Sequence, residues 1–173
     1  TDHKRRVASL SKLDVASRTN HAAVVEAGGV AVLGQVLEEF IDAQGPAERL
    51  LLSAVRALSS IPPGDCVTVV GPLIRVVDSR DKHEQDNDEH IDLWTRLVEG
   101  QAYEAAVRAS ESSAVVEALV GLVNRSSDEQ AQTLASRAIL TLATVADVPT
   151  TAEPSAVFDV LSGGTAGTME PLV

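Results

Sequence analysis

Residues 21–37 read HAAVVEAGGVAVLGQVL, and most of them favour a helix. Two adjacent glycines, Gly28 and Gly29, interrupt the run near its middle. Glycine adopts positive φ without a steric cost and leaves the backbone bare where two helices meet. The stretch therefore predicts a short helix, a sharp turn and a longer helix. Whether this unit recurs in the chain decides the fold class.

The apolar spacing of the longer helix does recur. Residues 33–37, LGQVL, carry apolar side chains at positions i, i+3 and i+4, which form one face of a helix. The same spacing starts again at Leu73, Leu119 and Val157, at intervals of 38 to 46 residues. Polar or small residues follow each copy, as they do after many helices.

A second helical pattern lies between these copies. Residues 46–61 begin with a proline, which is favoured in a first turn, and a Pro-Pro-Gly sequence follows them. Residues 127–142 are their counterpart, with Ser127 and Gln130 at the spacing of a capping box. The two interleaved patterns share a period near 40 residues, which is typical of armadillo and HEAT-type α-solenoids.

Residues 20–37 resemble the armadillo repeat, in which a short helix ends in a Glu-Ala-Gly-Gly turn before a second and a third helix. The match is best over residues 20–61, next best over 102–143 and loose over 62–100. The resemblance implies an all-α, right-handed α-solenoid of about three full repeats plus a partial unit, with HEAT-like repeats as the alternative subtype. The other interpretations are an ordinary helical bundle and an α/β domain with a strand at 67–70.

The repeat frame also predicts the organisation of the chain. Armadillo-like repeats are expected over residues 1–148, and a partial repeat or cap with a flexible C-terminal tail over 149–173. Within the first segment we expect the third helix of a preceding unit at 2–15 and repeats at about 18–61, 64–99 and 101–146. The second of these repeats would carry a long acidic insertion.

Composition and charge limit the classes of function. The chain has 173 residues, of which 45% are hydrophobic, so it is long enough to bury a core. Its net charge of −11 comes from residues 81–173, and aromatic residues make up only 2%. Nucleic acids and anionic membranes require clustered positive charge, so both are excluded as partners. The acidic half favours a basic partner if it binds any.

The single cysteine, Cys66, excludes an internal disulfide and favours a reducing compartment, the cytoplasm or the nucleus. We expect Cys66 to be a buried structural thiol, because no basic residue adjoins it. No run of 18 apolar residues predicts a membrane span, and the N-terminal residues do not resemble a signal peptide. The chain opens on Thr1 instead of methionine, which favours a fragment or a processed protein.

The sequence from 80 to 93, RDKHEQDNDEHIDL, is the one candidate for a metal site, through His83 and His90. The HExxH pattern fails because Asn87 occupies the second histidine position, and the EF-hand pattern lacks its glycine. We therefore predict no metal and no cofactor, and interpret the segment as a hydrated acidic loop that could dock a basic partner. Its candidate docking residues are Asp81, Glu84, Asp86, Asp88 and Glu89.

The armadillo resemblance implies a concave face lined by the third helices. In peptide-binding members an Asn late in each third helix, with a Trp four residues earlier, holds an extended peptide. None of the matching positions here carries those residues, so an importin-like reader of basic signals is not expected. Lys12, Arg56, Arg96 and Arg137 instead lie at or near these positions, as a ladder of basic side chains on or near one face. This ladder would suit an acidic partner, unless its members only bridge local acids. The predicted binding residues are Lys12, Arg56, Ser60, Asp92, Arg96, Arg137 and Thr141.

These patterns together predict a non-enzymatic scaffold or adaptor that binds a protein or peptide segment along the concave face. One alternative is a fragment of a larger scaffold or chaperone adaptor whose main site lies outside this chain. A second is an all-α metal-dependent enzyme that uses His83 and His90. A metal-dependent rise in melting temperature, abolished by His83→Ala, would favour the enzyme.

Overall fold

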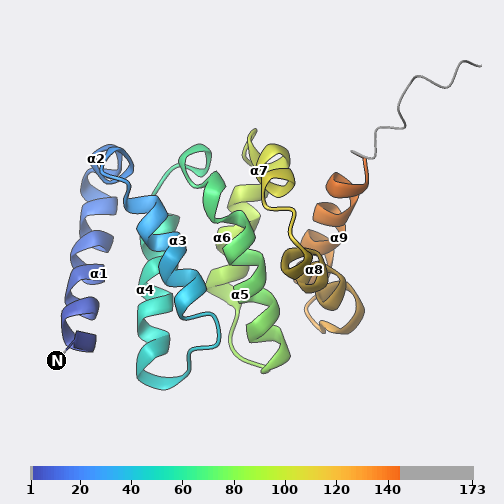
Figure 1. Cartoon of the computed structure of the whole chain (residues 1–173), viewed down its shortest axis with the longest axis horizontal. Helices are drawn as coiled ribbons and strands as arrows, with labels where there is room; N and C mark the ends of the chain where they lie inside the picture. Colours follow the sequence, from blue (N-terminus) through green and yellow to red (C-terminus); the bar gives the residue numbers. More distant parts are fainter. Residues whose placement is uncertain (1, 145–173) are drawn as a thin grey trace, which may run out of the picture. The chain divides into compact units, whose positions relative to one another are not determined.

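The computed structural model describes residues 2–144 of the chain, and the predicted cap at 149–173 lies outside the described residues. Residues Thr1–Ala143 form one compact unit. Every regular element of the described residues is helical, which confirms the all-α prediction (Figure 1). The elements are α1 Asp2–Thr19, α2 His21–Glu26, α3 Gly29–Glu39, η1 Gly45–Ala47, α4 Glu48–Ser59, η2 Pro63–Asp65, η3 Val67–Val69, α5 Val70–Lys82, α6 Asp88–Val98, α7 Tyr103–Ala109, α8 Ser113–Arg125 and α9 Glu129–Ala143.

The two glycines stand at the turn between α2 and α3, as predicted. Gly28 has φ +77° in the left-handed region, where a β-carbon would introduce strain. Gly29 begins α3, and a β-carbon there would lie 2.8 Å from the carbonyl oxygen of Val24. The Asn20 side chain caps α2 by accepting a hydrogen bond from the amide of Ala23 at 3.3 Å. Each glycine is thus required for a separate reason, one conformational and one steric.

The longer helices form two layers. In one layer α1 packs on α4, α4 on α6 and α6 on α9, and in the other α3 packs on α5 and α5 on α8 (Figure 1). The layers contact each other through α3 with α4, α5 with α6 and α8 with α9. Helices that hold equivalent places in the sequence pattern are therefore neighbours within a layer.

The core lies between the layers and consists mainly of Leu, Val and Ala side chains. The apolar positions that carry the sequence pattern, among them Leu33, Leu73 and Leu119, are fully buried. Trp94 of α6 is also fully buried, and its indole N–H donates to the Tyr103 hydroxyl at 3.3 Å. Cys66 is buried as expected, and burial raises the pKa of its thiol to about 12.

Two local predictions need correction, and the alternative of a strand at 67–70 is contradicted. The first helix runs to Thr19 rather than to residue 15, and residues 67–70 form a 3-10 turn and the start of α5 instead of a strand. The predicted acidic loop over residues 80–92 is short, because α5 continues through Lys82 and α6 begins at Asp88. An acidic first turn stabilises a helix N-terminus, so Asp88 and Glu89 extend α6 backwards into that segment.

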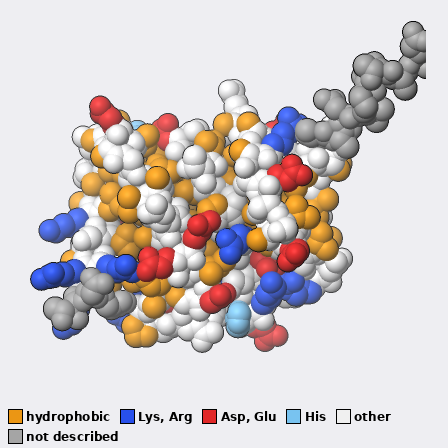
Figure 2. Space-filling view, in the orientation of Figure 1, with side chains coloured by type: hydrophobic (Ala, Val, Ile, Leu, Met, Phe, Trp, Pro, Cys, Tyr) orange, Lys and Arg blue, Asp and Glu red, His pale blue; other side chains and the backbone are white. Residues whose placement is uncertain are grey.

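Charged side chains are unevenly placed on the surface. Figure 2 shows basic side chains gathered at the N-terminal end of α1, where Lys4, Arg5 and Arg6 are exposed. Acidic and basic side chains are interspersed over the rest of that face. No helix in the described part of the chain is both long and apolar enough to cross a membrane.

Candidate functional site

The seven predicted binding residues lie on the four helices of one layer. Lys12 is on α1, Arg56 on α4 and Ser60 at its C-terminal cap, whereas α6 carries Asp92 and Arg96. Helix α9 carries Arg137 and Thr141. Lys12, Arg56, Asp92 and Arg137 are exposed, and the other three are partly buried. Because α1, α4, α6 and α9 pack in that order, these side chains belong to consecutive helices, which we call the α1–α4–α6–α9 face.

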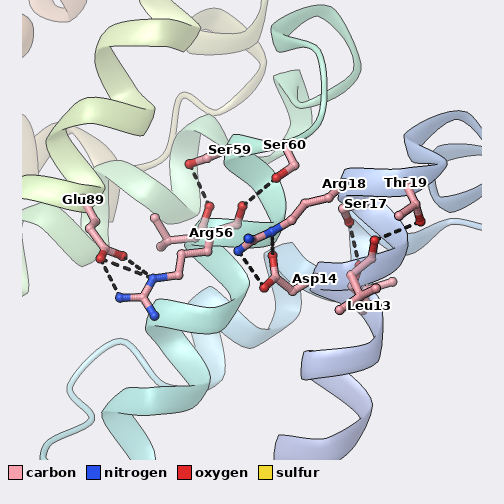
Figure 3. Close-up of polar contacts among 11 residues, drawn as sticks. Leu13, Asp14, Ser17, Arg18, Thr19, Arg56, Ser59, Ser60 and Glu89 are labelled. Atoms are coloured by element: carbon pink, nitrogen blue, oxygen red, sulfur yellow. Dashed lines mark hydrogen bonds and ion pairs between the residues drawn. The ribbon is translucent and has the colours of Figure 1, made fainter.

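Arg56 is already paired within the chain. Its Nη2 lies 2.7 Å from Oε1 of Glu89 on α6, and its Nε donates to Oε2 of the same carboxylate at 3.1 Å (Figure 3). This hydrogen bond, and then the charge of Glu89, raises the pKa of Arg56 above its usual value, with a smaller contribution from Asp14. Asp14 itself pairs with Arg18 on α1 at 2.9 Å. The Arg56–Glu89 pair therefore bridges α4 and α6 across the face.

Arg96 is also occupied. Its guanidinium donates to the carbonyl oxygens of Ser59 and Ile61, at the end of α4. A cation is favourable there because helix C-termini carry partial negative charge and unsatisfied carbonyl groups. For Arg56 and Arg96, the interpretation that ladder arginines bridge local groups holds. Among the described residues, Lys12 and Arg137 have no ion pair.

The predicted acidic docking residues lie in three places. Asp81, on α5, accepts a hydrogen bond from the Ser126 hydroxyl and lies 3.5 Å from Nε of Arg125, so it joins α5 to α8. Glu84, with φ +52°, lies in the short loop between α5 and α6. The remaining three, Asp86, Asp88 and Glu89, lie in or beside the first turn of α6.

These three acids meet Arg56 in one cleft of about 380 Å³, which we call the α4–α6 cleft. It lies between α4, the C-terminal part of α5 and the first turn of α6. Two sites that the sequence suggested separately, the face and the acidic segment, thus adjoin one another. The lining residues are Glu48, Leu52, Arg56, Arg80, Asp86, Asp88, Glu89 and His90.

Two of the lining residues are buried polar side chains: Arg80, which the sequence analysis did not place in a site, and His90, which it considered only as a metal ligand. Arg80 is 2% exposed; its Nη2 lies 2.6 Å from Oε1 of Glu48 and its Nε donates to the Asp86 carbonyl at 2.7 Å. Its Nη1 has no hydrogen-bond partner. His90 is fully buried, and neither ring nitrogen has a partner. Burial, and then the nearby Arg80 charge, lowers the pKa of His90 to about 4, so the imidazole is neutral at pH 7.

The two histidines considered as metal ligands have different surroundings. Nδ1 of His83 lies 2.7 Å from the carbonyl oxygen of Ser79 at the end of α5, whereas His90 is buried under the cleft. Within residues 2–144 no group of three or more His, Cys, Asp or Glu side chains is arranged to hold a metal ion.

Comparisons of the chain with family models, curated proteins and solved structures found no match. What the protein does must therefore be argued from the geometry of the α1–α4–α6–α9 face and its cleft.

Proposed function

We propose that this chain is a right-handed α-solenoid of armadillo type that acts as a non-enzymatic adaptor. It binds a protein or peptide segment along the α1–α4–α6–α9 face. The observation that carries this proposal is the order of packing: helices that recur at about 40 residues in the sequence lie next to one another in two layers. Such stacking supplies a long continuous surface, which suits an extended or helical segment.

The side chains of the face support binding rather than burial against the chain's own core. Lys12, Asp92 and Arg137 are exposed on three of its four helices, and the α4–α6 cleft opens beside Arg56 on the fourth. Exposed charged groups of both signs favour a partner of complementary charge pattern and fix its register. None of the seven predicted binding residues lies on the other layer, α3, α5 and α8.

Site-specific photo-crosslinking tests the proposal. A photoreactive residue is introduced singly at Lys12, Asp92 or Arg137, in the organism from which the gene comes. Control positions are Gln35 on α3 and Glu117 on α8, which are exposed on the other layer. We expect adducts of one partner from the three face positions and none from the controls. Adducts confined to Gln35 and Glu117 would place the binding surface on the opposite layer and refute the proposal.

A further inference from the structure

We propose that the α4–α6 cleft receives a basic side chain, arginine or lysine, from the partner segment. This inference rests on the proposed adaptor function and specifies the chemistry of the partner. Three observations support it. The cleft has a net negative charge, buried nitrogen atoms beneath it lack hydrogen-bond partners, and the arginines around it are already paired with groups of the same chain.

The cleft carries uncompensated negative charge. Its two arginines each have an acidic partner, Arg56 with Glu89 at 2.7 Å and Arg80 with Glu48 at 2.6 Å. The two other lining carboxylates, Asp86 and Asp88, are exposed and have no ion pair within residues 2–144. A guanidinium or ammonium group at this position would form charge-assisted hydrogen bonds with them. The four carboxylates and two arginines that line the cleft give it a net charge of −2, which favours a cation over an anion.

The floor of the cleft supplies a second, independent observation. His90 is fully buried and lines the cleft, yet neither of its ring nitrogens has a partner. A neutral imidazole offers one lone pair and one N–H, and leaving both unpaired away from water destabilises the folded chain. A basic side chain that enters the cleft can donate an N–H to the bare ring nitrogen. Nη1 of Arg80, also unpartnered, can donate to a carbonyl oxygen of the same segment.

The internal pairing of Arg56 and Arg96 also leaves less positive charge for an acidic partner than the basic ladder implied. The ladder of Lys12, Arg56, Arg96 and Arg137 would suit an acidic partner unless its members only bridge local acids. Arg56 forms an ion pair with Glu89, and Arg96 donates hydrogen bonds to the carbonyl oxygens of Ser59 and Ile61 at the end of α4. Within the cleft Arg56 and Arg80 are both paired, so Asp86 and Asp88 are its carboxylates without an ion pair among the described residues. Oδ1 of Asp86 also accepts a hydrogen bond from the Asp88 amide at 3.2 Å.

Fluorescence anisotropy with labelled peptides tests the inference. The probes are short peptides that carry several arginines, several lysines or several glutamates on one glycine–alanine background. They are titrated with the full chain at low and at physiological salt. We expect the arginine and lysine peptides to bind and the glutamate peptide not to bind.

Two double variants separate the cleft from the overall negative charge. Asp86→Asn with Asp88→Asn removes the two free carboxylates, and Glu104→Gln with Glu117→Gln removes two exposed carboxylates elsewhere. The first pair should weaken binding of the arginine peptide about fivefold or more, the second less than about twofold. A third variant, His90→Leu, should also weaken binding while circular dichroism shows an intact helical fold.

Three results would overturn the inference: preferential binding of the glutamate peptide, equal loss in the two double variants, or no binding of either basic peptide at millimolar concentration. Each is distinguishable from failure of the adaptor function. Crosslinks at Asp92 and Arg137 to a segment without basic residues would retain the adaptor and refute the basic side chain. Binding of basic peptides without crosslinks from the face would do the reverse.

Discussion

At the scale of single residues, His90 is the clearest departure from an apolar core. It occupies a fully buried position on α6, between the charged Glu89 and the buried Ile91 in sequence. A histidine buried without partners stays neutral because the charged form would lose its hydration. Arg80 adds a repulsive charge, whereas Asp86 and Glu48 act in the opposite direction with smaller effect.

This arrangement makes stability depend on pH. The pKa of His90 is about 4 in the folded chain, against 6.5 for an ordinary histidine, so the unfolded chain binds a proton first as the pH falls. Protonation of His90 does not affect the free energy of unfolding above pH 6.5, and it lowers that free energy progressively as the pH falls towards 4. The loss should approach about 3 kcal/mol. Urea unfolding at several pH values between 7 and 4 measures it.

The matched control for the pH series is His90→Leu, which replaces the imidazole by an apolar side chain of similar size. Other carboxyl groups also titrate near pH 4, so the informative quantity is the difference between the two proteins at each pH. At pH 7 the variant should be about 1 kcal/mol more stable, because it no longer buries unpaired polar atoms. Parallel stability–pH curves for the two proteins would mean that His90 does not control the dependence.

At the scale of elements, the turns and caps decide where each helix begins. The sequence pattern placed a capping box at Ser127 and Gln130, but α9 begins one residue later, at Glu129. The Asp128 carboxylate accepts a hydrogen bond from the amide of Ala131 at 2.9 Å, so Asp128 is the cap. Gln130 instead donates to the Thr95 hydroxyl on α6. Gln130 thus makes a tertiary contact with α6 instead of the capping contact that the local pattern predicted.

The cap can be tested with two adjacent alanine substitutions. Asp128→Ala should lower the free energy of unfolding by about 1 kcal/mol, because it leaves the amide of Ala131 without its acceptor. Ser127→Ala, at the exposed neighbouring position, should change it by less than about 0.5 kcal/mol. Chemical denaturation measures both free energies of unfolding. A larger loss for Ser127→Ala than for Asp128→Ala would indicate that Ser127 is the cap.

The Gly-Gly turn offers a second test at this scale. Gly28→Ala should destabilise the chain by about 1 kcal/mol, since the left-handed conformation is strained for a residue with a β-carbon. Gly28→Asn should cost less, because asparagine tolerates that conformation better. Gly64→Ala is the matched control: its backbone is not left-handed and a β-carbon there meets no atom within 4 Å. Thermal unfolding of the three variants should rank Gly28→Ala lowest in melting temperature.

At the scale of the whole Thr1–Ala143 unit, most contacts join helices that follow one another within a layer or that face each other across the two layers. In a linear array each unit depends mainly on its neighbours, so terminal helices should open before central ones. Trp94, the single tryptophan, lies buried on α6 and reports on the interior of the array. Far-ultraviolet circular dichroism reports on all helices together. The two signals can therefore separate opening of an end from opening of the middle.

We expect Leu10→Ala, which removes a buried side chain of α1, to separate the two signals in a urea titration. The helical signal should fall earlier than in the unmodified chain, while the midpoint of the Trp94 fluorescence changes little. Leu73→Ala, at a fully buried position of α5, is the control and should lower both midpoints together. Coincident transitions in the Leu10→Ala variant would indicate one cooperative unit instead of a linear array.

The sequence by itself determined the local features of this protein: helices from the apolar spacing, the turn at Gly28 and Gly29, and a core of small aliphatic side chains. These depend on residues within a few positions of one another, so periodicity reveals them. The right-handed solenoid and its repeats remain predictions that extend this pattern.

The tertiary structure alone decided which charges remain available. Arg56 pairs with Glu89 across 33 residues, and Arg80 with Glu48 across 32, and no local pattern marks such partners. It also placed His90 beneath a cleft instead of beside His83 in a metal site. Long charged side chains reach whichever helix packs against their own, so the chemistry of the face follows from the packing of helices within and between layers rather than from spacing along the chain.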